Sequence, residues 1–179
     1  MSGSTAESIA CTECEETLRF PGDMFLYQPP DDTGEPSYRK WNWASVLTDR
    51  IWCHSCEAPR YAERVPSLRE FNTAAAVRRF PDFPRPDNLE DELLDVDDEQ
   101  FRFLFVHLSN RRGSGNCLSC GGSSCAPLDI AVDRVVNFSH PHCGGAFQFK
   151  SLFVNFYGPR TIRWFNVDGT FLGTQHDRF

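Results

Sequence analysis

Four short motifs, each with two metal-binding side chains separated by two residues, constrain this chain more than any other feature. We call each motif a knuckle, because one tight turn presents both ligands. Zinc takes four tetrahedral ligands, so two knuckles complete one site. The spacing therefore predicts two structural Zn²⁺ ions. The eight expected ligands are Cys11, Cys14, Cys53, Cys56, Cys117, Cys120, His140 and Cys143.

The order of the knuckles along the chain predicts how they pair. The third and fourth knuckles are separated by 19 residues, a spacing usual for zinc ribbons. The first and second are separated by 38 residues, which is long, although loop-closure entropy grows only slowly with length. We therefore expect sequential pairing. A crossed arrangement, in which alternate knuckles share a zinc, stays open and would need the two halves to interlock.

The last two knuckles carry a further signal. Each is followed by two glycines, and glycine permits the positive φ that turns backbone N–H groups toward a thiolate. His140 takes the first ligand position of the fourth knuckle by spacing. His142 and Cys125 are the alternatives for that fourth ligand, and Cys125 also fits a small buried apolar residue.

The eight cysteines favour metal over disulfides if the chain resides in a reducing compartment. The first ten residues are polar and lack the apolar region of a secretory signal. No stretch approaches the roughly 18 apolar residues that span a bilayer. We therefore expect a cytoplasmic protein. An iron–sulfur cluster would use the same thiolates, but a histidine in one set favours zinc.

On these motifs the chain resembles zinc-ribbon and treble-clef proteins, over residues 11–60 and 117–175. The resemblance implies small β-hairpin modules whose zinc is structural. We expect an α+β fold of two zinc-ribbon-like modules joined by a short helical middle, with a C-terminal antiparallel β-meander. The expected divisions are a disordered lead (1–10), a first zinc-binding module (11–66), a helical connector with an acidic segment (67–110) and a second zinc-ribbon module with the meander (111–179).

Local signals place several elements. Ser67 and Glu70 form a capping box that predicts a helix ending near Phe80, before a proline. We expect a short helix within residues 37–51, and a second helix capped by Asp87. Residues 101–108 suit either a helix or a strand, because their phenylalanines alternate.

The acidic segment carries the functional hypothesis. Residues 87–100 contain eight acidic and no basic side chains, whereas the formal charge of the whole chain is −7. Such runs are most often solvated helix faces. They also suit docking of a basic protein partner, as in an immunity or antitoxin-like inhibitor. The expected partner-binding residues are Asp87, Glu90, Asp91, Glu92, Asp95, Asp97, Asp98 and Glu99.

Two other functions receive less support. Arginines after residue 110, together with aromatic residues, suit a zinc ribbon that binds nucleic acid, but a net charge of +4 over residues 101–179 is weak. A zinc enzyme is the third hypothesis. Catalytic zinc keeps an open position, and both expected sites count four ligands. We therefore expect no catalytic residues, with a Cys125–His142 pair as the remaining candidate for nucleophilic chemistry.

Overall fold

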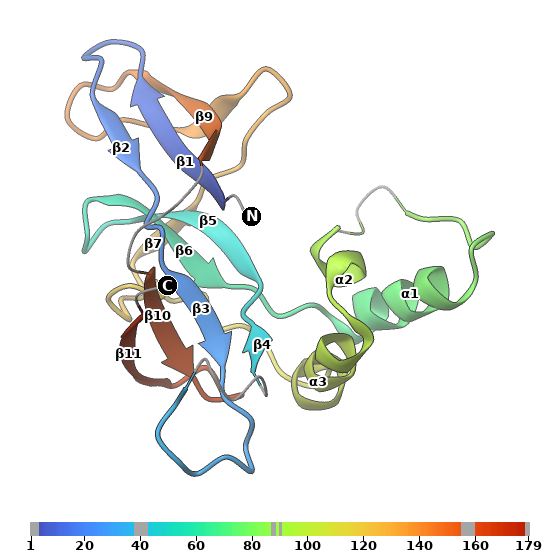
Figure 1. The fold of residues 1–179 in the computed structure, drawn as a ribbon. Helices are drawn as coiled ribbons and strands as arrows, with labels where there is room; N and C mark the ends of the chain where they lie inside the picture. The colour runs from blue at the N-terminus through green and yellow to red at the C-terminus, as the bar shows by residue number, and fades with distance from the viewer. Residues whose placement is uncertain (1–3, 38–42, 87–88, 90, 155–159, 178–179) are drawn as a thin grey trace.

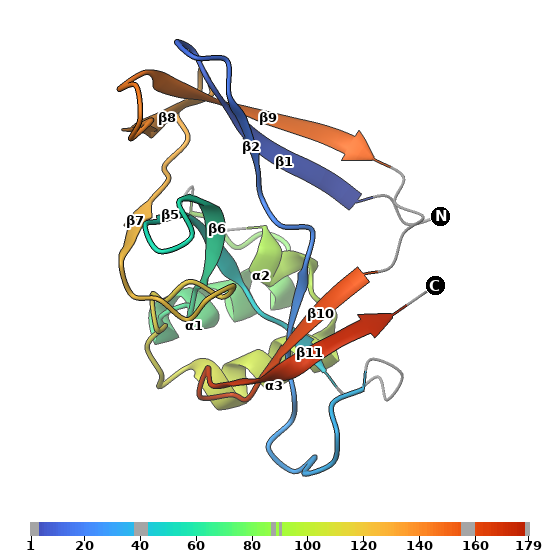
Figure 2. The same ribbon diagram turned by 90° about the vertical axis from the view of Figure 1, so that its left-hand side faces the viewer.

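Both ends of the chain contribute to one four-stranded sheet. The computed structural model describes residues 4–37, 43–86, 89, 91–154 and 160–177. Strand β1 (Ser4–Cys11) lies between β2 (Thr17–Arg19) and β9 (Ala146–Val154), and β8 (Val135–Ser139) completes the order β2-β1-β9-β8 (Figures 1 and 2). The expected disordered lead is therefore wrong for residues 4–10. This polar segment is ordered by main-chain pairing to β9, from Ser4 opposite Val154 to Cys11 opposite Phe147.

Two further sheets also combine early and late segments. One has the order β6-β5-β7, and the other has the order β11-β10-β3-β4, with β3 and β10 parallel. The expected C-terminal meander is wrong, because the β8–β9 hairpin joins β1 whereas the β10–β11 hairpin joins β3. The strands are β3 (Met24–Tyr27), β4 (Ala44–Ser45), β5 (Thr48–Cys53), β6 (Ala58–Glu63), β7 (Cys125–Pro127), β10 (Arg160–Phe165) and β11 (Phe171–Asp177).

The helices form a lobe beside the sheets (Figures 1 and 2). Helix α1 (Leu68–Arg79) has the expected capping box: the Ser67 hydroxyl accepts from the Glu70 N–H, and the Glu70 carboxylate accepts from the Ser67 N–H. It ends at Phe80, as predicted. Helix α2 (Glu92–Asp95) and helix α3 (Asp98–Leu108) follow.

Other local expectations have mixed outcomes. Residues 101–108 are helical, because Asp97 caps α3 and the buried Leu104 and Leu108 repeat at helical spacing. The short helix expected within 37–51 is wrong: β4 and the start of β5 occupy its described part. The Asp87 cap lies outside the described residues.

Two apolar clusters hold the layers together. The larger joins sheet β11-β10-β3-β4 to the helices, with Phe25, Phe71 and Leu104 among its members. The second lies between the other two sheets, where Trp52 stacks on Phe147 with ring centroids 5.8 Å apart. The described helices include none that has both the length and the apolar character to cross a membrane.

A buried ionic network connects these layers. The Tyr27 hydroxyl and the Arg111 guanidinium both donate to the Glu63 carboxylate, whose side chain is 1% exposed. Arg111 also donates to the Val167 carbonyl. Burial, reinforced by the Glu63 charge, raises the pKa of Tyr27 well above its usual range, so the phenol stays a donor. A side chain at Gly169 would collide with Arg111, which explains the glycine in this turn.

We predict that Arg111→Met destabilises the metal-loaded protein by roughly 3–5 kcal/mol, because it leaves the buried Glu63 charge without an ionic partner. Denaturant unfolding measures the change. Arg85→Met is the matched control: its ion pair with Asp91 is exposed and should contribute at most about 1 kcal/mol. Equal losses in the two variants would contradict a special role for the buried network.

Candidate metal centres

The eight expected ligands gather in two clusters of four, but not in the expected pairs. The first cluster comprises Cys11, Cys14, His140 and Cys143, and the second comprises Cys53, Cys56, Cys117 and Cys120. Within each cluster the ligand atoms all lie within 4.8 Å of one another. Sequential pairing is therefore wrong, and so is alternation: the first knuckle meets the fourth, and the second meets the third.

Strand pairing explains this nested arrangement. The first and fourth knuckles lie at one end of the sheet in which β1 pairs with β9, at the turns of the β1–β2 and β8–β9 hairpins. The second knuckle is the β5–β6 turn, and the third precedes β7, which pairs with β5. Each cluster therefore combines one knuckle that precedes the helices in the sequence with one that follows them.

The first cluster has the spacing of a tetrahedral site. The Sγ atoms of Cys11 and Cys143 lie 3.3 Å apart, and His140 Nδ1 lies 3.3 Å from Cys14 Sγ and 3.2 Å from Cys143 Sγ. Four ligands at Zn–S distances of about 2.3 Å and Zn–N distances of about 2.0 Å would be separated by roughly 3.5–3.8 Å. A slight expansion of the cluster would seat the ion.

The second cluster is an all-sulfur site. Its Cys53 and Cys120 Sγ atoms lie 3.6 Å apart, close to the tetrahedral value. Cys53 and Cys117 are buried, whereas Cys120 is exposed. All eight cysteines of the chain are free thiols, so no disulfide competes with coordination at either cluster.

Neighbouring thiols in a cluster disfavour one another's ionisation. Hydrogen bonding from the backbone N–H of Cys14 lowers the pKa of Cys11 to about 6. The Gly145 N–H also acts to lower the pKa of Cys143, but the Cys11 sulfur, burial and the Cys14 sulfur together outweigh it and raise this pKa to about 11. Burial and neighbouring sulfurs likewise raise the pKa of Cys56 to about 12. A bound cation would relieve this competition, because it stabilises every thiolate together.

All four knuckles share one backbone feature. The residue after the second ligand has a positive φ: 60° at Glu15, 49° at Glu57, 74° at Gly121 and 73° at Gly144. This conformation turns the following N–H groups back toward sulfur, as at Gly122, whose N–H lies 3.4 Å from Cys120 Sγ. Glycine adopts it without strain, whereas glutamate does so at a small cost.

The second glycine of each pair has a different purpose. A Cβ at Gly145 would lie 2.7 Å from Cys11 Sγ, and one at Gly122 would lie 3.1 Å from the Ser55 hydroxyl. Each glycine therefore lets its knuckle approach the opposite knuckle of the same cluster. Each cluster thus joins a knuckle followed by glutamate to a knuckle followed by two glycines.

Glu16 is a candidate positioning residue that the sequence analysis missed. Its carboxylate lies 3.2 Å from His140 Nε2, while Nδ1 of the same ring faces the sulfurs. A histidine ligand commonly donates its second N–H to a carboxylate, which sets the tautomer and the ring orientation. Three glutamates lie near the first knuckle, and only the β1–β2 turn determines which one reaches the histidine.

The two alternatives for the fourth ligand lie outside the ligand sets. His142 is exposed, and its ring packs edge-on to the His140 ring. Cys125 faces Cys53 across the β5–β7 pair and donates to the Gly122 carbonyl. The nucleophilic Cys125–His142 pair is therefore wrong, because the two residues flank different clusters.

The acidic segment is partly neutralised within the chain. Arg85 pairs with Asp91, and Arg78 pairs with Asp98. Asp97 caps α3 by accepting from the Gln100 N–H. Asp95 and Glu99 are exposed, with no partner among the described residues. Asp87 and Glu90 lie outside the described residues, and Glu92 is described only in its backbone, as the first residue of α2.

Two of the arginines that suggested nucleic-acid binding are engaged inside the protein. Arg111 belongs to the buried Glu63 network, and Arg163 pairs with Asp23 at 2.7 Å. Several of the late aromatic residues are core, with Phe147, Trp164 and Phe165 all buried, while Phe171 is about half exposed.

Native mass spectrometry can test the pairing. We predict that Cys14→Ser combined with Cys143→Ser removes one metal ion of two, because both residues serve the first cluster. Cys14→Ser combined with Cys56→Ser should remove both ions. Sequential pairing predicts the opposite pattern, and the mass of the retained ion identifies the element.

We predict that Glu16→Ala weakens metal binding at the first cluster by about 10- to 100-fold, because His140 loses its orienting partner. Competition with a chromophoric chelator measures the affinity. Glu13→Ala is the control, because it removes an exposed carboxylate from the same knuckle. Equal affinities in both variants would show that Glu16 does not support the ligand.

Comparisons with known proteins add no relative. No protein-family model, no curated protein and no solved structure matches the chain. The eight side chains and the backbone that positions them are therefore the observations that indicate two candidate metal-binding clusters.

Proposed function

We propose that the protein is a zinc-stabilised interaction module that binds a basic protein partner. Seven cysteines and one histidine form the two clusters, and such sulfur-rich tetrahedral sets suit zinc. Four protein ligands leave no open position for a substrate, which favours a structural role. Each ion would join a knuckle before the helical lobe to one after it, so metal binding and folding would be coupled.

The charge distribution of the helical lobe carries the proposal for the partner. Arg78 is 17% exposed, and its guanidinium donates to the carbonyls of Leu93, Leu94 and Val96 and to Asp98. Arg85 likewise donates to the Leu89 carbonyl and to Asp91, so these two arginines are directed to particular groups within the lobe. Three carboxylates, which we call the acidic face, stay exposed at the start of α3 and just before it: Asp95, Asp97 and Glu99.

This face supports a basic partner better than a nucleic acid. Clustered carboxylates repel phosphates and accelerate association with a positively charged protein surface. Two of the arginines that would contact a nucleic acid, Arg111 and Arg163, are held by Glu63 and Asp23. An inhibitor of a basic enzyme or toxin is one member of the proposed class.

Affinity capture from a nuclease-treated lysate tests the proposal. We expect one stoichiometric basic protein, which is lost when the acidic face is neutralised by Asp95→Asn, Asp97→Asn and Glu99→Gln together. The control carries Asp31→Asn, Glu57→Gln and Asp82→Asn, an equal change of charge at exposed sites elsewhere. Partner binding that survives neutralisation of the acidic face, or capture of nucleic acid alone before nuclease treatment, would contradict the proposal.

A further inference from the structure

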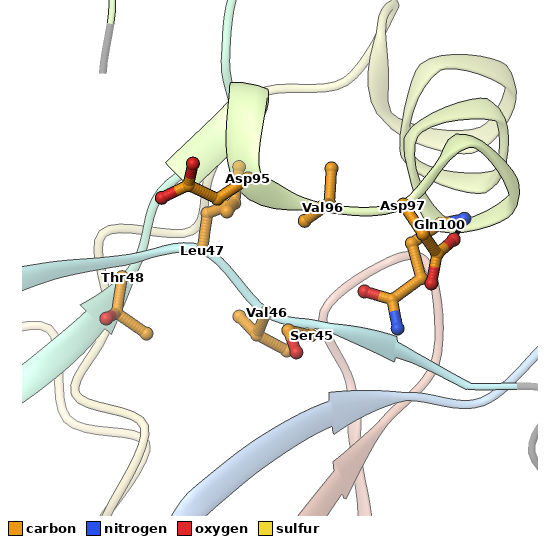
Figure 3. Close-up of a pocket in the computed structure, with 8 residues that line it drawn as sticks. All are labelled: Ser45, Val46, Leu47, Thr48, Asp95, Val96, Asp97 and Gln100. Atoms are coloured by element: carbon orange, nitrogen blue, oxygen red, sulfur yellow. Dashed lines mark hydrogen bonds between the residues drawn. The ribbon is translucent and has the colours of Figure 1, made fainter. Parts of the chain in front are cut away.

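A groove lies between the helical lobe and the segment that joins β4 to β5 (Figure 3). It encloses about 530 Å³, within the range of roughly 300–1,000 Å³ that is typical of ligand sites. One wall is the segment 45–48, where the chain passes from β4 to β5. The other wall is the segment 95–97, between α2 and α3, together with Gln100.

The first wall presents a strand edge. β4 is the last strand in the order β11-β10-β3-β4. The Val46 N–H donates to the Phe25 carbonyl, so Val46 and Phe25 form a hydrogen-bonded pair. Hydrogen-bonded and non-hydrogen-bonded pairs alternate along antiparallel strands. The preceding residue, Ser45, therefore has its N–H and C=O directed away from β3. Figure 3 shows that the side of this segment opposite β3 faces residues 95–100.

The second wall is held in place before any ligand binds. Val96 is extended, with φ −68° and ψ 147°, and its carbonyl accepts from Arg78 at 2.6 Å. The same guanidinium lies 4.8 Å from the centre of the Phe101 ring. Arg78 therefore clamps the α2–α3 connection against α1, which lowers the entropic cost of binding.

The groove has acidic ends and an apolar middle. In Figure 3 Asp95 lies toward Thr48, whereas Asp97 and Gln100 lie toward the opposite end. Val46, Leu47 and Val96 lie between them. This pattern complements an extended chain that alternates basic and apolar side chains, because residues at i and i+2 of a strand share a face.

We propose that this groove binds an extended basic segment of the partner, which adds as a strand to the edge of β4 that no strand of the described residues occupies. The inference rests on the proposed function and names its binding mode. Main-chain hydrogen bonds to Ser45 provide affinity, whereas Asp95 and Asp97 select basic side chains.

A titration followed by amide chemical shifts tests the binding mode. The probe is the peptide acetyl-Gly-Arg-Val-Arg-Val-Arg-Gly-amide, added to the metal-loaded protein up to about 1 mM, a concentration that detects weak binding. We expect shifts at Ser45, Thr48 and Val96. Asp95→Asn with Asp97→Asn should raise Kd at least about tenfold, and Asp31→Asn with Asp82→Asn should leave it unchanged.

Two changes remove backbone hydrogen bonds without altering charge. Ser45→Pro deletes the outward N–H, which proline tolerates on an edge strand, and N-methylation of the peptide valines deletes donors on the ligand. Each should weaken binding by about tenfold. The methylated peptide keeps the test valid if the proline variant fails to fold.

The outcomes separate this inference from the proposed function. Binding that is unchanged by N-methylation but lost in Asp95→Asn with Asp97→Asn overturns strand addition and leaves the basic partner in place. Shifts that map outside the groove, or no shifts at all, overturn the groove as the site. If the captured partner still binds both the Asp95→Asn with Asp97→Asn variant and the Ser45→Pro variant, the proposed function itself is overturned.

Discussion

Coordination of one cation by four side chains from opposite ends of the chain is the constraint on which the proposed architecture depends. The first cluster joins Cys14 to His140, 126 residues apart, and the second joins Cys53 to Cys120, 67 residues apart. Cross-links that close long loops remove much conformational entropy from the unfolded chain. Without a cation the same sulfurs compete for charge, as the opposed pKa shifts of Cys11 and Cys143 indicate. A bound cation would relieve this repulsion and would link the segment before the helical lobe to the segment after it.

Charges inside and outside the molecule have separate purposes. The buried Glu63 pairs with the partly buried Arg111, and with Tyr27 they join β3, β6 and the segment after α3. Arg78 neutralises Asp98 while it fixes the α2–α3 connection. These internal pairings leave Asp95 and Asp97 exposed at the groove, where the acidic segment meets the edge of β4. Arg78 thus both holds the helices of the lobe together and fixes one wall of the proposed docking groove.

Local signals in the sequence were reliable where the chain itself provides both partners of an interaction. Ser67 and Glu70 satisfy each other's backbone within one turn, so the start of α1 and its end before Pro81 could be predicted. Residues 4–10 and 44–53 carry weak local patterns, and strands on distant parts of the chain provide their hydrogen-bond partners. Their strand structure could not be inferred from their own composition.

The sequence by itself determined the eight candidate metal ligands and the α+β character, because residue type and two-residue spacing are properties of a single turn. Only the tertiary structure decided which knuckles meet, because β1 pairs with β9 and β5 pairs with β7. It also selected Glu16 as the partner of His140, and it placed Asp95 and Asp97 opposite β4. These facts depend on contacts between distant residues, whose register is set by sheet pairing and core packing rather than by any local motif.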